Sequence, residues 1–385
     1  MKTYEYLIVG GGMTADAAVR GIRSRDKSGT IAVLCGENHP PYDRPPLSKK
    51  LWTGKPFDSV WRKTADAGAD LILGTRAVGG DVAAKTITDD RGGVYGYRKL
   101  LLATGGTPRR LPAAAEGIIY FRTLDDYQRL RALADRRAEC LVIGGGFIGS
   151  EIAAALAMNG CPVTMVFPDS GIGARIYPPA LSEFLNGYFR DKGVKVLAGE
   201  KIVAVEKSGA RFDVGTGSGK RPSADAVTAG IGIEPEVGLA RSLGLRIDNG
   251  IVVDEQLRAA PDIFAAGDVA NFHSAALDTR RRVEHEDNAN TMGAMAGRNM
   301  AGAAETYEYL PYFYSDLFDL GYEAVGEFGA GLDVVEDWVE PFRHGVVYYL
   351  KSGRVRGVLL WNTWGKVDAA RALIAGKEAF KPAAL

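Results

Sequence analysis

Two glycine clusters, each directly after a short apolar run, are the residues in this chain whose spacing points most clearly to chemistry. The first reads Gly10-Gly11-Gly12-Met13-Thr14-Ala15, which fits G-x-G-x-x-A, and Glu37 follows after a second apolar run. Glycines let the backbone approach a pyrophosphate closely, and the N-terminus of the helix that follows offers free N–H groups to its negative charge. An acid at the end of the next strand can accept hydrogen bonds from ribose hydroxyls. This pattern predicts a dinucleotide site made by Gly10, Gly12, Ala15 and Glu37.

The second cluster repeats the pattern about 130 residues later, which indicates an internal duplication of a nucleotide-binding unit. Gly144, Gly146 and Gly149 give the full three-glycine form, and Asp169 takes the place of Glu37. An acid at this position favours a free ribose 2′-hydroxyl and repels a 2′-phosphate. We therefore expect NADH to be preferred over NADPH, although Arg175 is close enough in sequence to reach a phosphate.

The elements that must position these turns alternate between strand and helix. The expected order is strand 6–9, helix 15–22 and strand 30–34, then strand 140–143, helix 148–158 and strand 163–167. Further buried strands end in glycine turns at 100–106 and 226–232, and the run 263–268 delivers Asp268 at its carboxyl end. This alternation predicts an α/β protein with two Rossmann-like domains.

The C-terminal region has a different pattern. From about Tyr309 the chain is rich in aromatic and β-branched residues. The runs 345–350 and 357–361, separated by Ser352-Gly353, predict an antiparallel hairpin, and a helix is expected over 367–374. This region is expected to be α+β.

Charge and composition exclude several classes of function. The 47 basic and 47 acidic residues cancel, which argues against a nucleic-acid or membrane-surface partner held by bulk charge. No uncharged apolar run of about 18 residues predicts a membrane span. The three cysteines, Cys35, Cys140 and Cys161, form no C-x-x-C pair, so no redox-active dithiol is expected. Few cysteines and a first strand that begins without a signal pattern predict a cytoplasmic protein.

Two nucleotide sites in one chain indicate a tightly held prosthetic group and an exchanging hydride donor. A flavin facing a nicotinamide is the commonest such pairing, so FAD is expected in the first unit and NADH in the second. Asp268 is well placed to accept a hydrogen bond from the ribityl chain of FAD.

The proline-rich stretch Pro41 to Lys49 is unusual for a loop, and a helix is expected to begin near Ser48. A lysine held there beside a flavin would stabilise negative charge on its reduced form. A buried lysine needs a partner. We assign Glu151, because its helix neighbours, Ile148, Ile152 and Ala155, are apolar.

Together these residues resemble the FAD/NAD-linked reductases, in the branch of ferredoxin reductases and apoptosis-inducing factor. The resemblance implies the fold of the pyridine nucleotide-disulfide oxidoreductases, without the redox disulfide. The most specific motifs are Pro41 to Lys49, Phe147 with Glu151, Phe167-Pro168-Asp169, Arg282-Val283-Glu284-His285, Phe313-Tyr314-Ser315-Asp316 and Gly321-Tyr322-Glu323. The resemblance implies an FAD-binding domain over 1–113 and 233–308, split around an NAD-binding domain over 114–232, and a C-terminal α+β domain over 309–385.

The resemblance also assigns roles to single residues. Arg44 and Lys49 lie on the flavin side, Lys49 pairs with Glu151, and Phe147 gates the nicotinamide face. Lys49, Glu151, Phe147, His285 and Tyr314 form the implied catalytic set. Further FAD contacts are implied at Ala103, Thr104, Gly105, Gly267, Asp268, Glu284, His285 and Tyr314. The implied NAD contacts are Gly144, Gly146, Phe147, Ile148, Glu151, Asp169, Arg175, Gly232 and Glu323.

The expected activity is that of an FAD-dependent NADH oxidoreductase. It passes a hydride from NADH to FAD, and electrons then go to a ferredoxin-, rubredoxin- or quinone-type acceptor. The implied partner is a small redox protein or a small-molecule acceptor, without nucleic acid or membrane insertion, and a homodimer is possible.

Two alternatives stay open. Tyr314 stands where ferredoxin reductases and apoptosis-inducing factor usually have Trp, and it is similar to monodehydroascorbate reductases, but their substrate-side arginine would fall at Asn290. Without a cation there an anionic ascorbyl radical loses its obvious partner. The second alternative is a redox-responsive binding protein with slow turnover, similar to apoptosis-inducing factor. The long C-terminal insertion of apoptosis-inducing factor is absent from this sequence.

Overall fold

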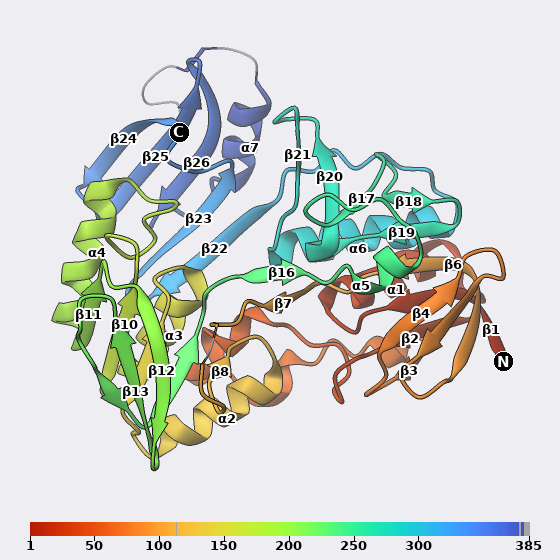
Figure 1. Ribbon diagram of the computed structural model, residues 1–385. Helices are drawn as coiled ribbons and strands as arrows, with labels where there is room; N and C mark the ends of the chain where they lie inside the picture. Colours follow the sequence, from red (N-terminus) through yellow and green to blue (C-terminus); the bar gives the residue numbers. More distant parts are fainter. Residues whose placement is uncertain (113, 377–378, 381–385) are drawn as a thin grey trace. The chain divides into compact units, whose positions relative to one another are not determined.

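The computed structural model describes residues 1–112, 114–376 and 379–380, and its backbone contacts divide the chain into two compact units. Unit 1 comprises Met1–Asp43, Asp58–Thr107 and Glu234–Phe313; unit 2 comprises Arg44–Phe57, Pro108–Ile233 and Tyr314–Leu385. Two of the five places where the chain passes from one unit to the other lie in short strands that pair with each other, β7 (Gly106–Pro108) and β16 (Ile233–Pro235) (Figure 1). The predicted domain boundary at residue 113, and residues 377–378 and 381–385 of the predicted C-terminal domain, lie outside the described residues. The three-domain division by cofactor stays a prediction.

Unit 1 is built on a mostly parallel sheet with strand order β18-β19-β6-β1-β2-β3. Its strands are β1 (Lys2–Val9), β2 (Ile31–Leu34), β3 (Ala69–Ile72), β6 (Val94–Leu102), β18 (Arg258–Ala260) and β19 (Ile263–Ala265). The hairpin of β4 (Ala77–Asp81) and β5 (Thr86–Asp89) extends from β6. A smaller sheet holds β17 (Ile251–Val252), β20 (Ala270–Ser274) and β21 (Thr279–Arg281).

Two long helices of unit 1, α1 (Met13–Arg25) and α6 (Glu286–Met300), pack closely together. Glycines permit this approach, because a Cβ built on Gly297 would lie 2.1 Å from the carbonyl oxygen of Ala18. Short helices complete the unit: α5 (Gly238–Ser242) and the 3-10 helices η3 (Phe57–Val60), η4 (Thr64–Ala67) and η5 (Gly267–Val269).

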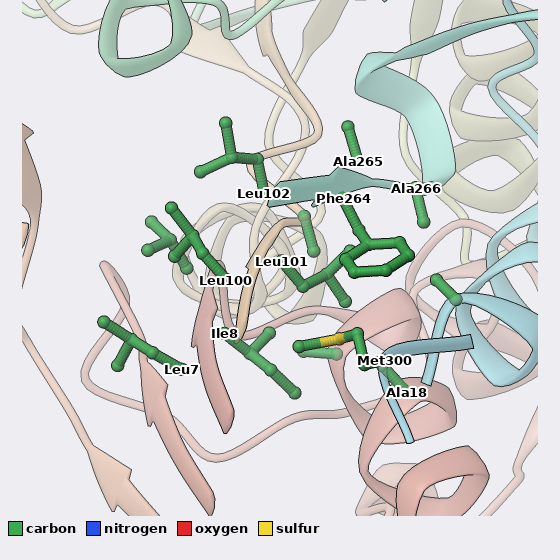
Figure 2. Close-up of a cluster of buried hydrophobic side chains, with 14 of the residues drawn as sticks. Leu7, Ile8, Ala18, Leu100, Leu101, Leu102, Phe264, Ala265, Ala266 and Met300 are labelled. Carbon is green, nitrogen blue, oxygen red and sulfur yellow. The ribbon is translucent and has the colours of Figure 1, made fainter. Parts of the chain in front are cut away.

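The core of unit 1 explains why its strands read as unbroken apolar runs. Figure 2 shows Leu7 and Ile8 of β1 beside Leu100, Leu101 and Leu102 of β6, with Phe264 and Met300 in the same cluster. A strand of a parallel sheet that is covered on both faces must be apolar on both. The predicted buried strand over 6–9 is therefore confirmed, and the predicted runs 100–106 and 263–268 are strand as far as Leu102 and Ala265.

Unit 2 contains the second nucleotide-binding fold as a five-stranded parallel sheet in the order β11-β10-β9-β15-β8. The strands are β8 (Ile119–Tyr120), β9 (Cys140–Ile143), β10 (Val163–Phe167), β11 (Val194–Ala198) and β15 (Ala226–Ala229). The helices are α2 (Leu124–Asp135), α3 (Phe147–Met158) and α4 (Pro179–Asp191). A small antiparallel sheet of β12 (Ile202–Ser208), β13 (Arg211–Thr216) and β14 (Ser223–Ala224) is added.

The C-terminal part of unit 2 is an antiparallel sheet in the order β22-β23-β26-β25-β24 (Figure 1). Its elements are β22 (Tyr312–Leu317), β23 (Leu320–Gly326), β24 (Asp333–Glu340), β25 (His344–Lys351), β26 (Arg354–Trp361) and α7 (Val367–Ala375). The predicted hairpin is confirmed as β25 and β26, and the predicted last helix as α7. No helix among the described residues is long and apolar enough to cross a membrane.

The proline-rich segment differs from its prediction. No α-helix begins near Ser48; two 3-10 helices, η1 (Pro45–Leu47) and η2 (Lys50–Thr53), flank it instead. The backbone of Lys49, with φ −128° and ψ −101°, is not helical and separates the two turns, and Gly54 ends η2 in the left-handed conformation with φ +98°. The segment packs within unit 2 through Trp52, whose ring meets that of Tyr127 at 5.5 Å and whose carbonyl accepts a hydrogen bond from Asn159.

Candidate functional site

The first glycine turn has the geometry expected of a pyrophosphate cradle. Gly10 has φ +114°, and a Cβ there would lie 2.1 Å from the carbonyl oxygen of Ala103, so only glycine fits. Gly12 is the N-cap of α1, and a Cβ built on it would meet nothing within 4 Å among the described residues. The space before the helix N-terminus is thus open, and no described side chain caps the helix. With Ala15 buried in the first turn of α1, this cradle fits the pyrophosphate of a dinucleotide.

Other predicted FAD residues gather around this turn in unit 1. Gly267 has φ +78°. A Cβ built on it would lie 2.3 Å from Oγ1 of Thr14, which follows Gly12 by two residues in the chain. The Thr104 hydroxyl donates to the carbonyl of Glu236 at 2.6 Å, and Gly105 has φ +66°. Glu37 accepts a hydrogen bond from the Tyr42 hydroxyl at 2.6 Å.

Asp268, Glu284 and His285 are contacted by residues that were not predicted to belong to the site. Arg282, with a nearly buried side chain, donates to the Asp268 carbonyl at 3.0 Å and pairs with Glu284 at 2.6 Å. His285 is the N-cap residue of α6, and its ring stacks on Phe313 with centroids 4.2 Å apart. Arg282 and Phe313 both lie in motifs that carry the family resemblance. This membership is the sequence signal that could have identified them as part of the site.

The second glycine turn, in unit 2, repeats the first. Gly144 has φ +118°, and a Cβ there would lie 2.3 Å from the carbonyl oxygen of Gly230. A Cβ built on Gly149 would lie 2.1 Å from the carbonyl oxygen of Gly144. A Cβ built on Gly146, the N-cap of α3, would meet nothing within 4 Å among the described residues. This unit therefore also fits a dinucleotide pyrophosphate.

Asp169, the acid at the end of the strand that follows this second turn, lies near a basic residue. Asp169 follows β10, and its Oδ2 lies 3.4 Å from Nε of Arg175, whose side chain is 81% exposed. Phe147 and Ile148 open α3, and Ile148 is 37% exposed. Gly232 has φ +92°.

The structure brings the predicted pair Lys49 and Glu151 together inside unit 2. Lys49 Nζ lies 2.8 Å from Oε2 of Glu151, and the two side chains are 8% and 2% exposed. The same ammonium lies 5.3 Å from the ring centroid of Tyr314, a cation–π contact. Glu151 is thus a buried partner and not a surface residue of α3. The roles of these residues toward a bound flavin stay predictions.

Three residues around this pair were not predicted to be part of the site. The hydroxyls of Ser48 and Ser315 each donate to the Glu151 carboxylate at 2.6 Å. Burial raises the pKa of Asp316, and the charge of Glu151 adds to this rise, whereas Lys49 and Lys50 oppose it. All three residues lie in motifs that carry the family resemblance, which was the available signal, but their contacts depend on segments far apart in the chain.

Two residues that were predicted to contact the cofactors make hydrogen bonds within the protein, and their cofactor contacts stay predictions. Arg44 donates to the carbonyl of Arg122 at 2.8 Å within unit 2. Glu323 on β23 accepts a hydrogen bond from the Gly365 backbone at 3.3 Å.

The cysteines form no redox centre. All three are free and buried. Burial raises the pKa of Cys35 and of Cys140 to about 12. A buried thiol with a raised pKa is a poor nucleophile, so these side chains are packing residues.

Comparison with known proteins agrees with this arrangement. The family profile "Pyridine nucleotide-disulphide oxidoreductase" matches residues 4–293, and the profile "Apoptosis-inducing factor, mitochondrion-associated, C-term" matches residues 334–376. The mitochondrial apoptosis-inducing factor 1 of Dictyostelium discoideum is 32% identical, with 97% of this chain and 79% of that protein covered. Monodehydroascorbate reductase 3 of Arabidopsis thaliana is 34% identical, with 93% and 89% covered.

A solved structure extends the likeness to the whole chain. The ferredoxin reductase for the CYP199A2 system of Rhodopseudomonas palustris superimposes with a TM-score of 0.91 at 29% identity, covering 99% of this chain and 96% of that one. Two dinucleotide cradles with open helix N-termini account for the FAD and the pyridine nucleotide that such proteins use. By the extent of the family match, this chain belongs to the pyridine nucleotide-disulphide oxidoreductase family, as an FAD-dependent NAD(P)H oxidoreductase.

Proposed function

We propose that this protein oxidises NADH and delivers the electrons to a small redox protein of the ferredoxin or rubredoxin type, or to a quinone. FAD, when bound, takes two electrons from a reduced nicotinamide and can release them singly. The observation that carries the proposal is the buried Lys49–Glu151 pair on α3, the helix that opens at the second glycine turn. Lys49 supplies a fixed positive charge that favours the reduced, more negative form of a flavin.

The preference for NADH rests on Asp169. Its carboxylate repels a 2′-phosphate, and Arg175 offsets this repulsion only in part, because exposed ion pairs contribute about 0–1 kcal/mol. NADPH is therefore the weaker donor in this proposal.

The ferredoxin-type acceptor is supported by the likeness to a ferredoxin reductase over the whole chain. The chain has no dithiol motif, so electrons leave without a thiol relay.

Monodehydroascorbate reduction is the second candidate, favoured by 34% identity to such an enzyme and by Tyr314. At Asn290, where those enzymes carry an arginine, the side-chain oxygen accepts a hydrogen bond from Arg62 at 2.7 Å. A cation thus reaches this position from another part of unit 1. The positive charge of Arg62 is, however, balanced by two carboxylates, because Arg62 also pairs with Asp16 at 2.9 Å and with Asp43 at 2.8 Å. A neutralised guanidinium is a weak site for an anion, so we rank this candidate second.

The test is stopped-flow reduction of the purified FAD-loaded protein by NADH, followed by reoxidation with ferredoxin, rubredoxin, a quinone or the ascorbyl radical. Fast turnover with a ferredoxin, rubredoxin or quinone supports the proposal, and fast turnover with the ascorbyl radical alone supports the second candidate. Slow turnover with every acceptor, together with NADH-dependent dimerisation on a sizing column, would favour a redox-responsive binding protein. Folded protein that cannot take up FAD would refute all three.

A further inference from the structure

The carboxylate of Glu151 accepts hydrogen bonds from three side chains. Ser48 Oγ donates to Oε2 at 2.6 Å, Lys49 Nζ to the same oxygen at 2.8 Å, and Ser315 Oγ to Oε1 at 2.6 Å. Ser48, Glu151 and Ser315 are 5%, 3% and 1% exposed, so water does not compete for these bonds. The donors come from the turn between η1 and η2 and from strand β22, and the acceptor lies on α3, all within unit 2.

We propose that Ser48 and Ser315 are positioning residues that set how strongly Lys49 acts on a bound flavin. They do this by orienting the Glu151 carboxylate and by taking up part of its negative charge. The inference rests on the proposed function of Lys49.

The geometry supports the orienting role. Each oxygen of the carboxylate holds at least one hydroxyl donor, so rotation of the group would break two bonds at once. Hydrogen bonds from a hydroxyl to a carboxylate are roughly twice as strong as those between neutral groups. The carboxylate is therefore fixed with Oε2 toward Lys49.

The charge argument follows from the same contacts. A carboxylate bound only to Lys49 would cancel most of the ammonium's field. Two hydroxyl dipoles that point at the carboxylate offset part of its charge, which leaves more of the Lys49 field to act on its surroundings. In a poorly hydrated site such dipoles have a larger effect than in water.

Strand β22 contacts both members of the pair, which distinguishes this arrangement from a serine that merely fills space. Ser315 holds the carboxylate, while its neighbour Tyr314 places its ring beside the Lys49 ammonium. On the other side, Ser48 and Lys49 are adjacent residues that donate to the same oxygen. Both segments that donate to Glu151 therefore also involve Lys49. One contains the lysine, and the other contains Tyr314, whose ring lies beside its ammonium.

The test compares midpoint potentials of the FAD-loaded protein, measured by equilibrium reduction against a reference dye. Ser315→Ala and Ser48→Ala should each make the potential more negative. The expected fall in the equilibrium constant for flavin reduction is about 3–10-fold, where tenfold corresponds to about 30 mV for two electrons. Ser315→Thr, which keeps the hydroxyl, should stay within about twofold of the unmodified protein.

Ser182→Ala is the matched control. Its hydroxyl is equally buried in unit 2 and donates to the Ile172 carbonyl at 2.7 Å, so it should lower stability without moving the potential. Urea unfolding of each variant measures the structural cost separately from the electronic effect.

The Lys49→Met background separates this inference from the proposed function. If Lys49→Met itself leaves the potential unchanged, the proposed role of Lys49 fails. If Lys49→Met shifts the potential but the serine variants do not, only the inference is overturned. An equal shift from Ser315→Ala in the Lys49→Met background would overturn the orienting role, because only that role acts through Lys49.

Discussion

Removing Glu151 should destabilise the protein more than removing Lys49, although both changes break the same ion pair. Lys49→Met leaves the carboxylate with the hydroxyls of Ser48 and Ser315, which continue to solvate it. Glu151→Ala removes the acceptor of all three donors at once. It leaves a buried ammonium beside the ring of Tyr314 and two hydroxyls without this acceptor.

The magnitudes follow from these contacts. Removing one partner of a buried ion pair costs about 3–5 kcal/mol. Two hydrogen bonds to the remaining charge, each contributing about 1.5–3 kcal/mol, should keep Lys49→Met near the lower limit, about 3 kcal/mol. Glu151→Ala adds a penalty of about 1 kcal/mol or more for each hydroxyl, so it should reach about 5 kcal/mol. The difference of about 2 kcal/mol is roughly 30-fold in the folded-to-unfolded ratio.

The assay is equilibrium urea unfolding at a fixed excess of FAD, because bound cofactor stabilises the native state by mass action. Glu151→Gln is the matched variant, since its amide oxygen can still accept one hydroxyl, and it should fall between the two other changes. The same proteins should show non-additive kinetics. Each single change should slow flavin reduction by NADH about 10-fold or more, and Lys49→Met/Glu151→Gln should cost much less than the product. Equal destabilisation by the two single changes, or additive effects on the rate, would refute this account of the site.

Three further outcomes are expected. Asp169→Ser should raise the rate of flavin reduction by NADPH relative to NADH, and an unmodified protein that is faster with NADPH at equal subsaturating concentration would show that Arg175 dominates. Replacing the three buried thiols, Cys35, Cys140 and Cys161, by Ala or Ser should leave flavin reduction within a few-fold, with stability losses of about 1–3 kcal/mol; loss of electron transfer in the folded triple variant would reveal a thiol role. Burial raises the pKa of Asp316 in the folded state, so folding is penalised as pH rises through that raised pKa. Asp316→Asn should therefore be more stable than the unmodified protein at about pH 8 and lose this advantage toward about pH 4, near the unfolded pKa of an aspartate; an advantage that persists at low pH would contradict the burial argument.

The glycine turns were predictable because their requirement is local. Gly10 and Gly144 have φ values of +114° and +118°, which other residues rarely adopt, and each follows a strand whose apolar run is visible in the sequence. Apolar runs were enough to place the central strands of the two parallel sheets, but the smaller sheets of β12–β14 and of β17, β20 and β21 were not predicted. The same reasoning placed a helix near Ser48, where the non-helical backbone of Lys49 leaves only two 3-10 turns.

The contacts of the polar residues were less predictable. Lys49 and Glu151 lie 102 positions apart, and their pairing was inferred from a family resemblance and from the apolar neighbours of Glu151. Ser48 and Ser315 lie in motifs that carry the same resemblance, but their acceptor was not predicted, because a serine hydroxyl donates to whatever acceptor the fold brings near it. The same applies to Arg62, which joins α1, α6 and the loop at Asp43 through contacts that no local pattern records.

The cost of the buried pair is itself an argument for its role. Taking two charges out of water costs several kcal/mol for each ion, and replacing a buried pair by apolar residues of similar volume is often neutral or stabilising. Stability alone therefore does not explain why Lys49 and Glu151 lie 8% and 2% exposed in the middle of unit 2. Two serines, a tyrosine ring and a proline-rich turn hold this one ammonium and its carboxylate partner in place. Such a charge has value where negative charge develops during a reaction, and a flavin that accepts electrons from a nicotinamide is the partner that this family supplies.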